Sequence, residues 1–161
     1  MKNNIKTIAI IDDNPENLKA ATTAVSEFLP NTTIFTFNSA TDFFNEIGSE
    51  RPRFDFVISD MNMEERHSGF KVACLCWSWM VPTVIVSGGF THGKTAVSIG
   101  FIGTSIFGSK DDVGVWKEVL KAIFSGGEEN PIILSLMVGK NSRQCEAFGE
   151  IGGYSFAKHC R

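Results

Sequence analysis

The sequence lacks the features of several protein classes. Its 161 residues contain no apolar run near the ~20 residues that a membrane-spanning helix needs. Its first residues lead directly into a predicted strand and lack a signal-peptide pattern. It has no lysine and arginine block, and its net charge of −3 argues against nucleic-acid binding by counterion release. We therefore expect a cytoplasmic protein that binds neither membranes nor nucleic acid.

Cysteine is also scarce, at four residues, and its spacing does not indicate a disulfide framework. Cys74 and Cys76 lie in one apolar stretch, and Cys145 and Cys160 lie in the carboxyl-terminal part. Together with His159, the latter two lack the close ligand pairs of a zinc site. We expect reduced, partly buried thiols.

Length and composition indicate one globular domain. Hydrophobic residues make up 43% of the chain and charged residues 20%, which is ordinary for a soluble fold. The glycine-containing segment 125–130 reads as a linker. We therefore expect a domain over residues 1–125 and an extension of unknown role over 126–161, in which Pro131 begins a short helix through Met137.

Within the domain, short β-type runs alternate with helical patterns five times. Asn14 and Ser39 are typical helix caps, and Gly48 ends the second helix. The helix after the fourth strand is interrupted by glycines and should be short, around 94–99. The predicted strands are 6–11, 32–37, 56–58, 82–86 and 105–109, and the other predicted helices are 15–29, 40–47, 68–80 and 112–124. This alternation predicts a parallel sheet with helices on both faces.

Polar side chains follow four of these strands. Asp12 and Asp13 follow the first, Asp60 the third, Ser87 the fourth and Lys110 the fifth. The carboxyl ends of parallel strands form the ligand-binding edge of an open α/β sheet. We therefore expect these side chains to converge on one site.

This constellation resembles the receiver domain of two-component response regulators, over about residues 5–125. Asn62 after Asp60 also fits the family's loop pattern. The resemblance implies a flavodoxin-like, doubly wound sheet of five parallel strands in the order 2-1-3-4-5. It also implies a phosphorelay switch that accepts a phosphoryl group from a histidine kinase or a histidine phosphotransfer protein. Such a domain promotes its own phosphotransfer and dephosphorylation rather than turning over an external substrate, and it signals to a protein target, here unknown.

The resemblance assigns roles to individual residues. Asp60 would be the nucleophile and phosphoacceptor, with Ser87 and Lys110 contacting the phosphoryl oxygens. Asp13, Asp60 and the carbonyl of Asn62 would bind Mg²⁺, and Asp12 would hold one of its waters. Phosphorylation would draw the Ser87 hydroxyl inward, and the neighbouring Phe107 would fill the vacated space. Ser87 and Phe107 would thus form the switch.

Two positions depart from the family pattern. Glu64 stands where receivers usually have proline, and Asp111 stands where a proline in a cis peptide usually follows the lysine. A cis bond before a residue other than proline costs about 3–4 kcal/mol, so we expect a trans bond and a rearranged loop there.

Two alternative functions remain open. Residues 88–95, from Gly88 to Thr95, fit the phosphate-binding pattern G-x-x-x-x-G-K-[ST] and follow a predicted strand. However, the helix after them is weak, and about 65 residues follow the pattern, too few for the rest of a nucleotide-binding fold. The second alternative is a degenerate receiver that binds its partner constitutively.

Overall fold

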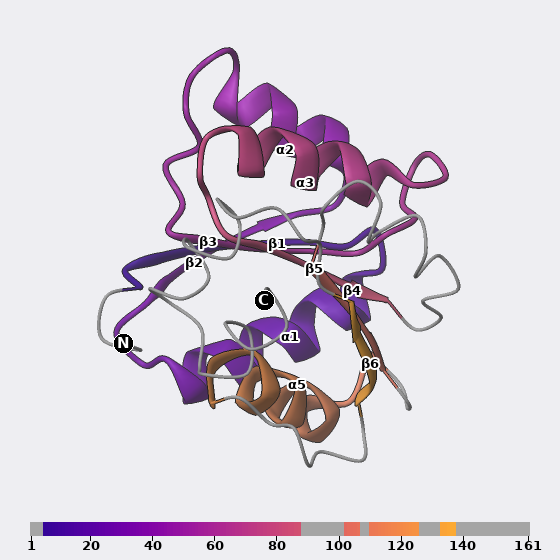
Figure 1. Cartoon of the computed structure of the whole chain (residues 1–161). Coiled ribbons are helices and arrows are strands. Elements are labelled where there is room, and N and C mark those ends of the chain that lie inside the picture. Colours follow the sequence, from indigo (N-terminus) through magenta and orange to yellow (C-terminus); the bar gives the residue numbers. More distant parts are fainter. Residues whose placement is uncertain (1–4, 88–101, 107–109, 126–132, 138–161) are drawn as a thin grey trace.

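The computed structural model describes residues 5–87, 102–106, 110–125 and 133–137. One six-stranded sheet forms its centre, with strand order β2-β1-β3-β4-β5-β6 (Figure 1). The strands are β1 Thr7–Ile11, β2 Thr33–Phe37, β3 Phe56–Ser59, β4 Thr83–Ser87, β5 Ile102–Ile106 and β6 Ile133–Met137. The helices are α1 Pro15–Phe28, α2 Ala40–Ile47, α3 Ser68–Ser78 and α5 Val113–Ser125. None of the helices in these ranges is long and apolar enough to cross a membrane.

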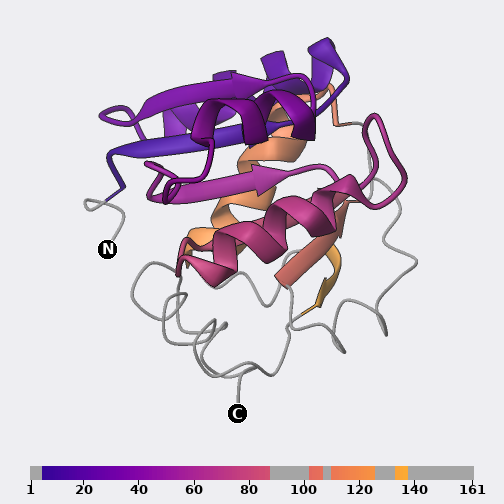
Figure 2. The same cartoon turned by 90° about the horizontal axis from the view of Figure 1, so that it is seen from above.

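Helices cover both faces of the sheet, as the sequence predicts. Figure 1 shows α2 and α3 on one face and α1 and α5 on the other, and Figure 2 shows α2 and α3 lying over the strands. Alternate residues of β1 serve the two faces, because successive side chains of a strand point to opposite sides. Ile8 and Ile10 pack in the core with α1 and α5, while Ala9 and Ile11 pack in the core with α2 and α3.

The first five strands are parallel and lie in the order 2-1-3-4-5, so the predicted flavodoxin-like fold is confirmed. β3 is buried along its whole length, which explains the apolar run over residues 56–58. It aligns with β1 so that Ile11 lies opposite Ser59. The residues that follow these two strands, Asp12 and Asp60, therefore emerge at the same edge.

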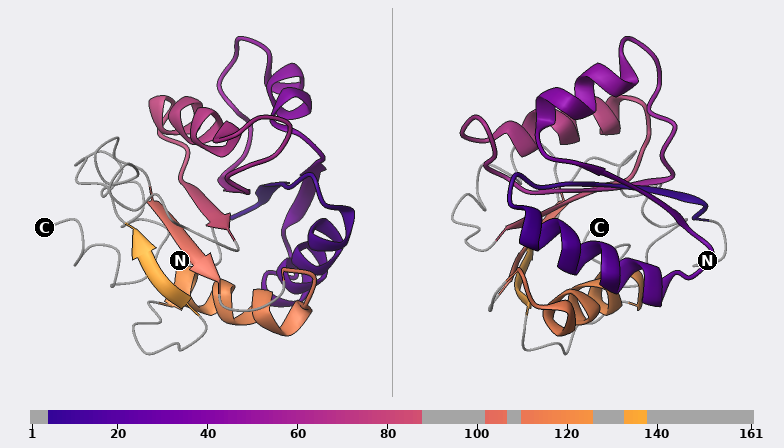
Figure 3. Two further views of the ribbon diagram at one scale, coloured as in Figure 1. Left: turned by 90° about the vertical axis from the view of Figure 1, so that its right-hand side faces the viewer. Right: turned by 180° about the vertical axis from the view of Figure 1, so that it is seen from behind.

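Two sequence predictions of secondary structure need correction. Residues Ile133–Met137, expected in a helix beginning at Pro131, form a strand instead: β6 runs antiparallel to β5 at the edge of the sheet (Figure 3, left). The backbone groups of the edge strand β5 would otherwise have no strand partner on that side, and pairing with β6 satisfies them. The fifth strand also begins earlier than predicted, at Ile102 rather than Ser105. The helix expected over 94–99 lies outside the described residues, and the division into domain and extension stays a prediction.

The helix starts follow the predicted capping. The Asn14 side chain accepts hydrogen bonds from the backbone N–H groups of Glu16 and Asn17, and Pro15 is the first residue of α1. The Ser39 hydroxyl accepts a hydrogen bond from the Asp42 N–H at the start of α2. Gly48 ends α2 with φ of 57° and ψ of −131°, a combination that residues with a Cβ avoid.

Candidate functional site

The acidic residues predicted from the sequence meet at the carboxyl-terminal edge of the sheet. Asp12, Asp13 and Asp60 each bring a carboxylate oxygen to within 4.8 Å of the other two. Asp12 is buried, Asp60 is half-buried and Asp13 is exposed, so the cluster opens to solvent on one side. Hard divalent cations prefer several oxygen ligands, and these three carboxylates suit Mg²⁺.

Asp12 is held in place by the first turn of α1. Its carboxylate accepts hydrogen bonds from the backbone N–H of Asn14, at 2.9 Å, and from the side-chain amide of Asn17, at 3.3 Å. Its own backbone N–H donates to the carbonyl of Phe37 on β2, at 3.1 Å. Hydrogen bonds to α1 and β2 therefore fix the side chain and the backbone of Asp12, respectively.

Asp60 continues the pairing between β1 and β3. Its backbone N–H donates to the carbonyl of Ile11 at 2.8 Å, and the hydroxyl of Ser59 donates to the carbonyl of Asp60 at 2.8 Å. Burial raises the pKa of the Asp60 carboxyl and the nearby Asp12 carboxylate adds to this, although the Lys110 ammonium opposes both. Three carboxylates face one ammonium in this cluster, so a divalent cation would offset the remaining negative charge.

Lys110 lies across this cluster, as predicted from its position after the fifth strand. Its ammonium donates to Asp12 at 2.6 Å and to Asp60 at 3.0 Å, and only 9% of its side chain is exposed. Among the described residues no peptide bond is cis, so the expected trans bond between Lys110 and Asp111 is confirmed. The backbone carbonyl of Lys110 accepts a hydrogen bond from the indole N–H of Trp116, at 2.6 Å.

Ser87 is the last residue of β4, one residue inside the strand rather than just after it as predicted, and it is buried. It lies opposite Ser105 of β5. Its predicted switch partner, Phe107, lies outside the described residues, as does the motif over 88–95. The role of the pair therefore stays a prediction.

The loop after Asp60 contains a contact that sequence analysis missed. The Glu64 carboxylate accepts hydrogen bonds from the backbone N–H groups of Ala40 and Thr41, both at 3.0 Å, and from the Thr41 hydroxyl at 3.3 Å. Glu64 thus caps α2 from another loop. Within the loop, the Asn62 side chain accepts from the His67 N–H at 2.8 Å. The role of the Asn62 carbonyl as a metal ligand stays a prediction.

Gly69 allows α3 to start directly against the acidic edge. A Cβ at this position would lie 2.0 Å from the Asp60 carbonyl oxygen and 2.8 Å from the Cα of Met61. The Gly69 N–H donates to the Met61 carbonyl at 2.9 Å, which fixes this approach. Sequence analysis did not single out Gly69, because only the folded chain brings it against Asp60.

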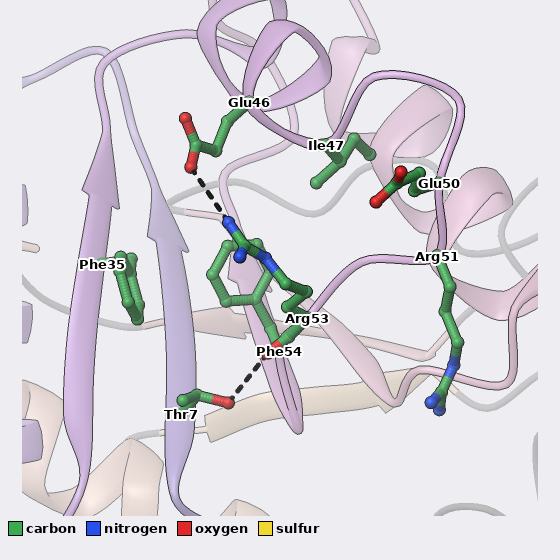
Figure 4. Close-up of a pocket in the computed structure, with 8 residues that line it drawn as sticks. All are labelled: Thr7, Phe35, Glu46, Ile47, Glu50, Arg51, Arg53 and Phe54. Carbon is green, nitrogen blue, oxygen red and sulfur yellow. Dashed lines mark hydrogen bonds and ion pairs between the residues drawn. The ribbon is translucent and has the colours of Figure 1, made fainter.

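A hollow of about 570 Å³ lies near the opposite end of the strands from the acidic cluster (Figure 4). It is flanked by Phe35 and Phe54, and Arg53 forms an ion pair with Glu46 across it at 3.7 Å. The Thr7 hydroxyl also donates to the Arg53 carbonyl, at 3.1 Å. None of its lining residues belongs to the acidic cluster, so it is a separate feature.

Comparison by sequence finds no matching family model and no matching curated protein. Comparison by structure finds many similar chains. The phosphorylated cyanobacterial phytochrome response regulator RcpA is 11% identical, with a TM-score of 0.59, and the match covers 81% of this chain and 99% of that one. A response regulator receiver domain from Rhodospirillum rubrum is 13% identical, with a TM-score of 0.58, covering 70% and 89%.

The chain has the receiver-domain fold. The chemotaxis response regulator CheY4 of Vibrio cholerae is a third similar structure, at 14% identity and a TM-score of 0.54, covering 73% of this chain and 97% of that one. In this chain the antiparallel strand β6 adds to the five parallel strands predicted from the sequence. At such identities the likeness concerns the fold, and function has to be argued from the acidic cluster itself.

Proposed function

We propose that this chain is a phosphorylation-controlled signalling switch, which accepts a phosphoryl group on Asp60. The supporting observation is the cluster of three carboxylates with the Lys110 ammonium, at the carboxyl-terminal edge of a receiver-type sheet. A carboxylate is a competent nucleophile toward phosphorus, and phosphoryl transfer depends mainly on positioning and charge neutralisation.

The proposed reaction has two half-reactions. A carboxylate oxygen of Asp60 attacks the phosphorus of a phosphohistidine on the donor, an O–P bond forms, the P–N bond breaks, and the donor histidine keeps the electron pair and takes up a proton. In the second half-reaction, which ends the signal, water attacks the phosphorus of the aspartyl phosphate. Inorganic phosphate then leaves and the Asp60 carboxylate is regenerated. The chain would thus act with a histidine kinase or a histidine phosphotransfer protein rather than turn over an external small molecule.

Individual residues have distinct parts in this proposal. Asp13, Asp60 and the Asn62 carbonyl would bind Mg²⁺, with Asp12 holding one of its waters, and the bound ion would neutralise phosphoryl charge. Lys110 would move from the carboxylates toward a phosphoryl oxygen, a short displacement for a long side chain that already contacts Asp60. Ser87, at the end of the neighbouring strand β4, would donate to a second oxygen.

The experiment is phosphorylation with a small donor. Incubation with acetyl phosphate and Mg²⁺ should add the mass of one phosphoryl group to the intact protein and none to Asp60→Ala. A matched control is Asp42→Ala, which removes a carboxylate on α2 and should label like the wild type. A wild-type protein that gains no mass would favour the degenerate-receiver alternative, and labelling of Asp60→Ala would contradict the assignment.

A further inference from the structure

The Lys110 ammonium pairs with Asp12 and Asp60, and its reach to both carboxylates depends on where the Lys110 backbone lies. A lysine side chain is a flexible four-carbon stem, and its head can occupy many positions unless the backbone below it is fixed. A contact that fixes the Lys110 backbone therefore also limits the positions open to the ammonium.

Trp116 provides such a contact. Its indole N–H donates to the carbonyl oxygen of Lys110 at 2.6 Å. The Trp116 side chain is buried, with 2% of the residue exposed, and it belongs to the core between the sheet, α1 and α5. Because the Trp116 indole is packed in the core, it cannot move with the Lys110 carbonyl. The hydrogen bond therefore restrains the position of the Lys110 peptide group.

The turn that carries Trp116 is itself fixed. The carboxylate of Asp112 caps α5 by accepting from the N–H groups of Gly114, at 2.7 Å, and Val115, at 3.3 Å. The backbone N–H of Trp116 donates to the Asp112 carbonyl at 3.2 Å. Two hydrogen bonds therefore link Trp116 back to the preceding residues: its backbone N–H donates to Asp112, and its indole N–H donates to Lys110.

We propose that Trp116 is a positioning residue, whose indole holds the Lys110 carbonyl and thereby directs the Lys110 ammonium to Asp12 and Asp60. The inference deepens the proposed function and rests on it only for the predicted effect on phosphorylation. It has a consequence for signalling: the first turn of α5 is linked to the acidic cluster through one hydrogen bond. A partner that displaces this turn would therefore change how Lys110 is held.

The first test measures how accessible the Lys110 ammonium is, without any phosphoryl donor. The metal-free protein is treated briefly with an amine-acylating ester, and the modification of each lysine is quantified by peptide mass spectrometry. Trp116→Phe should raise the rate at Lys110 roughly five- to tenfold, the equilibrium effect of losing one hydrogen bond. Lys117, the next residue of the same helix, should keep its rate.

The matched control is Trp79→Phe, since Trp79 is exposed near the end of α3 and far from Lys110 in the chain. This variant should leave the Lys110 rate unchanged. An unchanged acylation rate of Lys110 in Trp116→Phe would overturn the inference. Equal increases at Lys110 and Lys117 would also overturn it, because they would show a general loosening of α5. If Trp116→Phe does not fold, replacing the indole by a benzothiophene keeps the ring shape and removes only the donor, and the same outcomes apply.

The second test asks whether Trp116 acts through Lys110. The rate of phosphorylation by acetyl phosphate is measured in wild type, Trp116→Phe, Lys110→Ala and the double variant. Trp116→Phe should slow the reaction roughly five- to tenfold when Lys110 is present and have no effect when it is absent. Equal slowing in both backgrounds would overturn the inference. A wild type that is not phosphorylated at all would refute the proposed function, while the acylation result would still decide the role of Trp116.

Discussion

Glu64 offers the sharpest test of how the loop after Asp60 is held. Replacing it by alanine removes two hydrogen bonds to the first backbone N–H groups of α2 and one to the Thr41 hydroxyl. Loss of a helix cap costs about 0.5–2 kcal/mol, and loss of a negative charge near a helix amino terminus costs about 0.3–1 kcal/mol. Because Glu64 is exposed, we expect the lower half of the combined range, about 1–2 kcal/mol of unfolding free energy.

This contribution should depend on pH in a defined direction. Burial acts to raise the pKa of Glu64, but hydrogen bonds from its own backbone N–H and from Ala40 and Thr41 hold it below the ordinary value of 4.5. A carboxyl whose pKa is lowered by folding stabilises the fold above its unfolded pKa. That stabilisation is lost as the pH falls through the folded pKa. The difference between wild type and Glu64→Ala should therefore be full at pH 7 and shrink below about 4.5.

The assay is urea denaturation of the metal-free proteins at neutral and acidic pH. Glu65→Ala is the matched control, since Glu65 is the next residue, is exposed and pairs with Lys71 rather than with α2. It should cost less than about 0.5 kcal/mol, as exposed ion pairs usually do. The reasoning would be refuted if Glu64→Ala were no less stable than this control. It would also be refuted if the stability difference between wild type and Glu64→Ala stayed unchanged at acidic pH.

Three further predictions concern the acidic edge. Asp60→Asn should raise the stability of the metal-free protein at pH 7, because burial and Asp12 raise the pKa of the Asp60 carboxyl. The gain should vanish below pH 3.8, the ordinary pKa of this carboxyl, and a loss of stability at pH 7 would contradict the prediction. Gly69→Ala should lower the free energy of unfolding, measured by urea denaturation, by about 3 kcal/mol, because the new Cβ would lie 2.0 Å from the Asp60 carbonyl oxygen. A near-neutral effect would show that the two backbones can separate. Asp13→Ala should weaken Mg²⁺ binding at least tenfold by calorimetry, about 1.4 kcal/mol, whereas an unchanged affinity would remove its metal role.

The fold could be predicted well from the sequence because its signals are local. Asn14 and Ser39 mark helix starts through hydrogen bonds that span two or three residues. The continuous apolar run of β3 indicates a strand covered on both faces. The convergence of Asp12, Asp60 and Lys110 also follows, since all three emerge at the same end of parallel strands.

The missed features depend on contacts between residues distant in sequence. Nothing near Glu64 indicates that its carboxylate caps a helix 24 positions earlier. Trp116 reads as an ordinary core residue of α5 until its indole is seen to reach the Lys110 carbonyl. β6 was missed because Pro131 is a common helix start, whereas the edge of β5 provides the pairing that makes the segment a strand.

The central claim is that Asp60 carries the phosphoryl group, and its most direct test is to locate that group chemically. The protein is phosphorylated with acetyl phosphate and Mg²⁺ and then treated with borohydride, which reduces an aspartyl phosphate to homoserine. Peptide sequencing by mass spectrometry then identifies the reduced position. The account predicts homoserine at position 60 and aspartate at positions 12 and 13. Homoserine at either of those two positions, or at none, would contradict it.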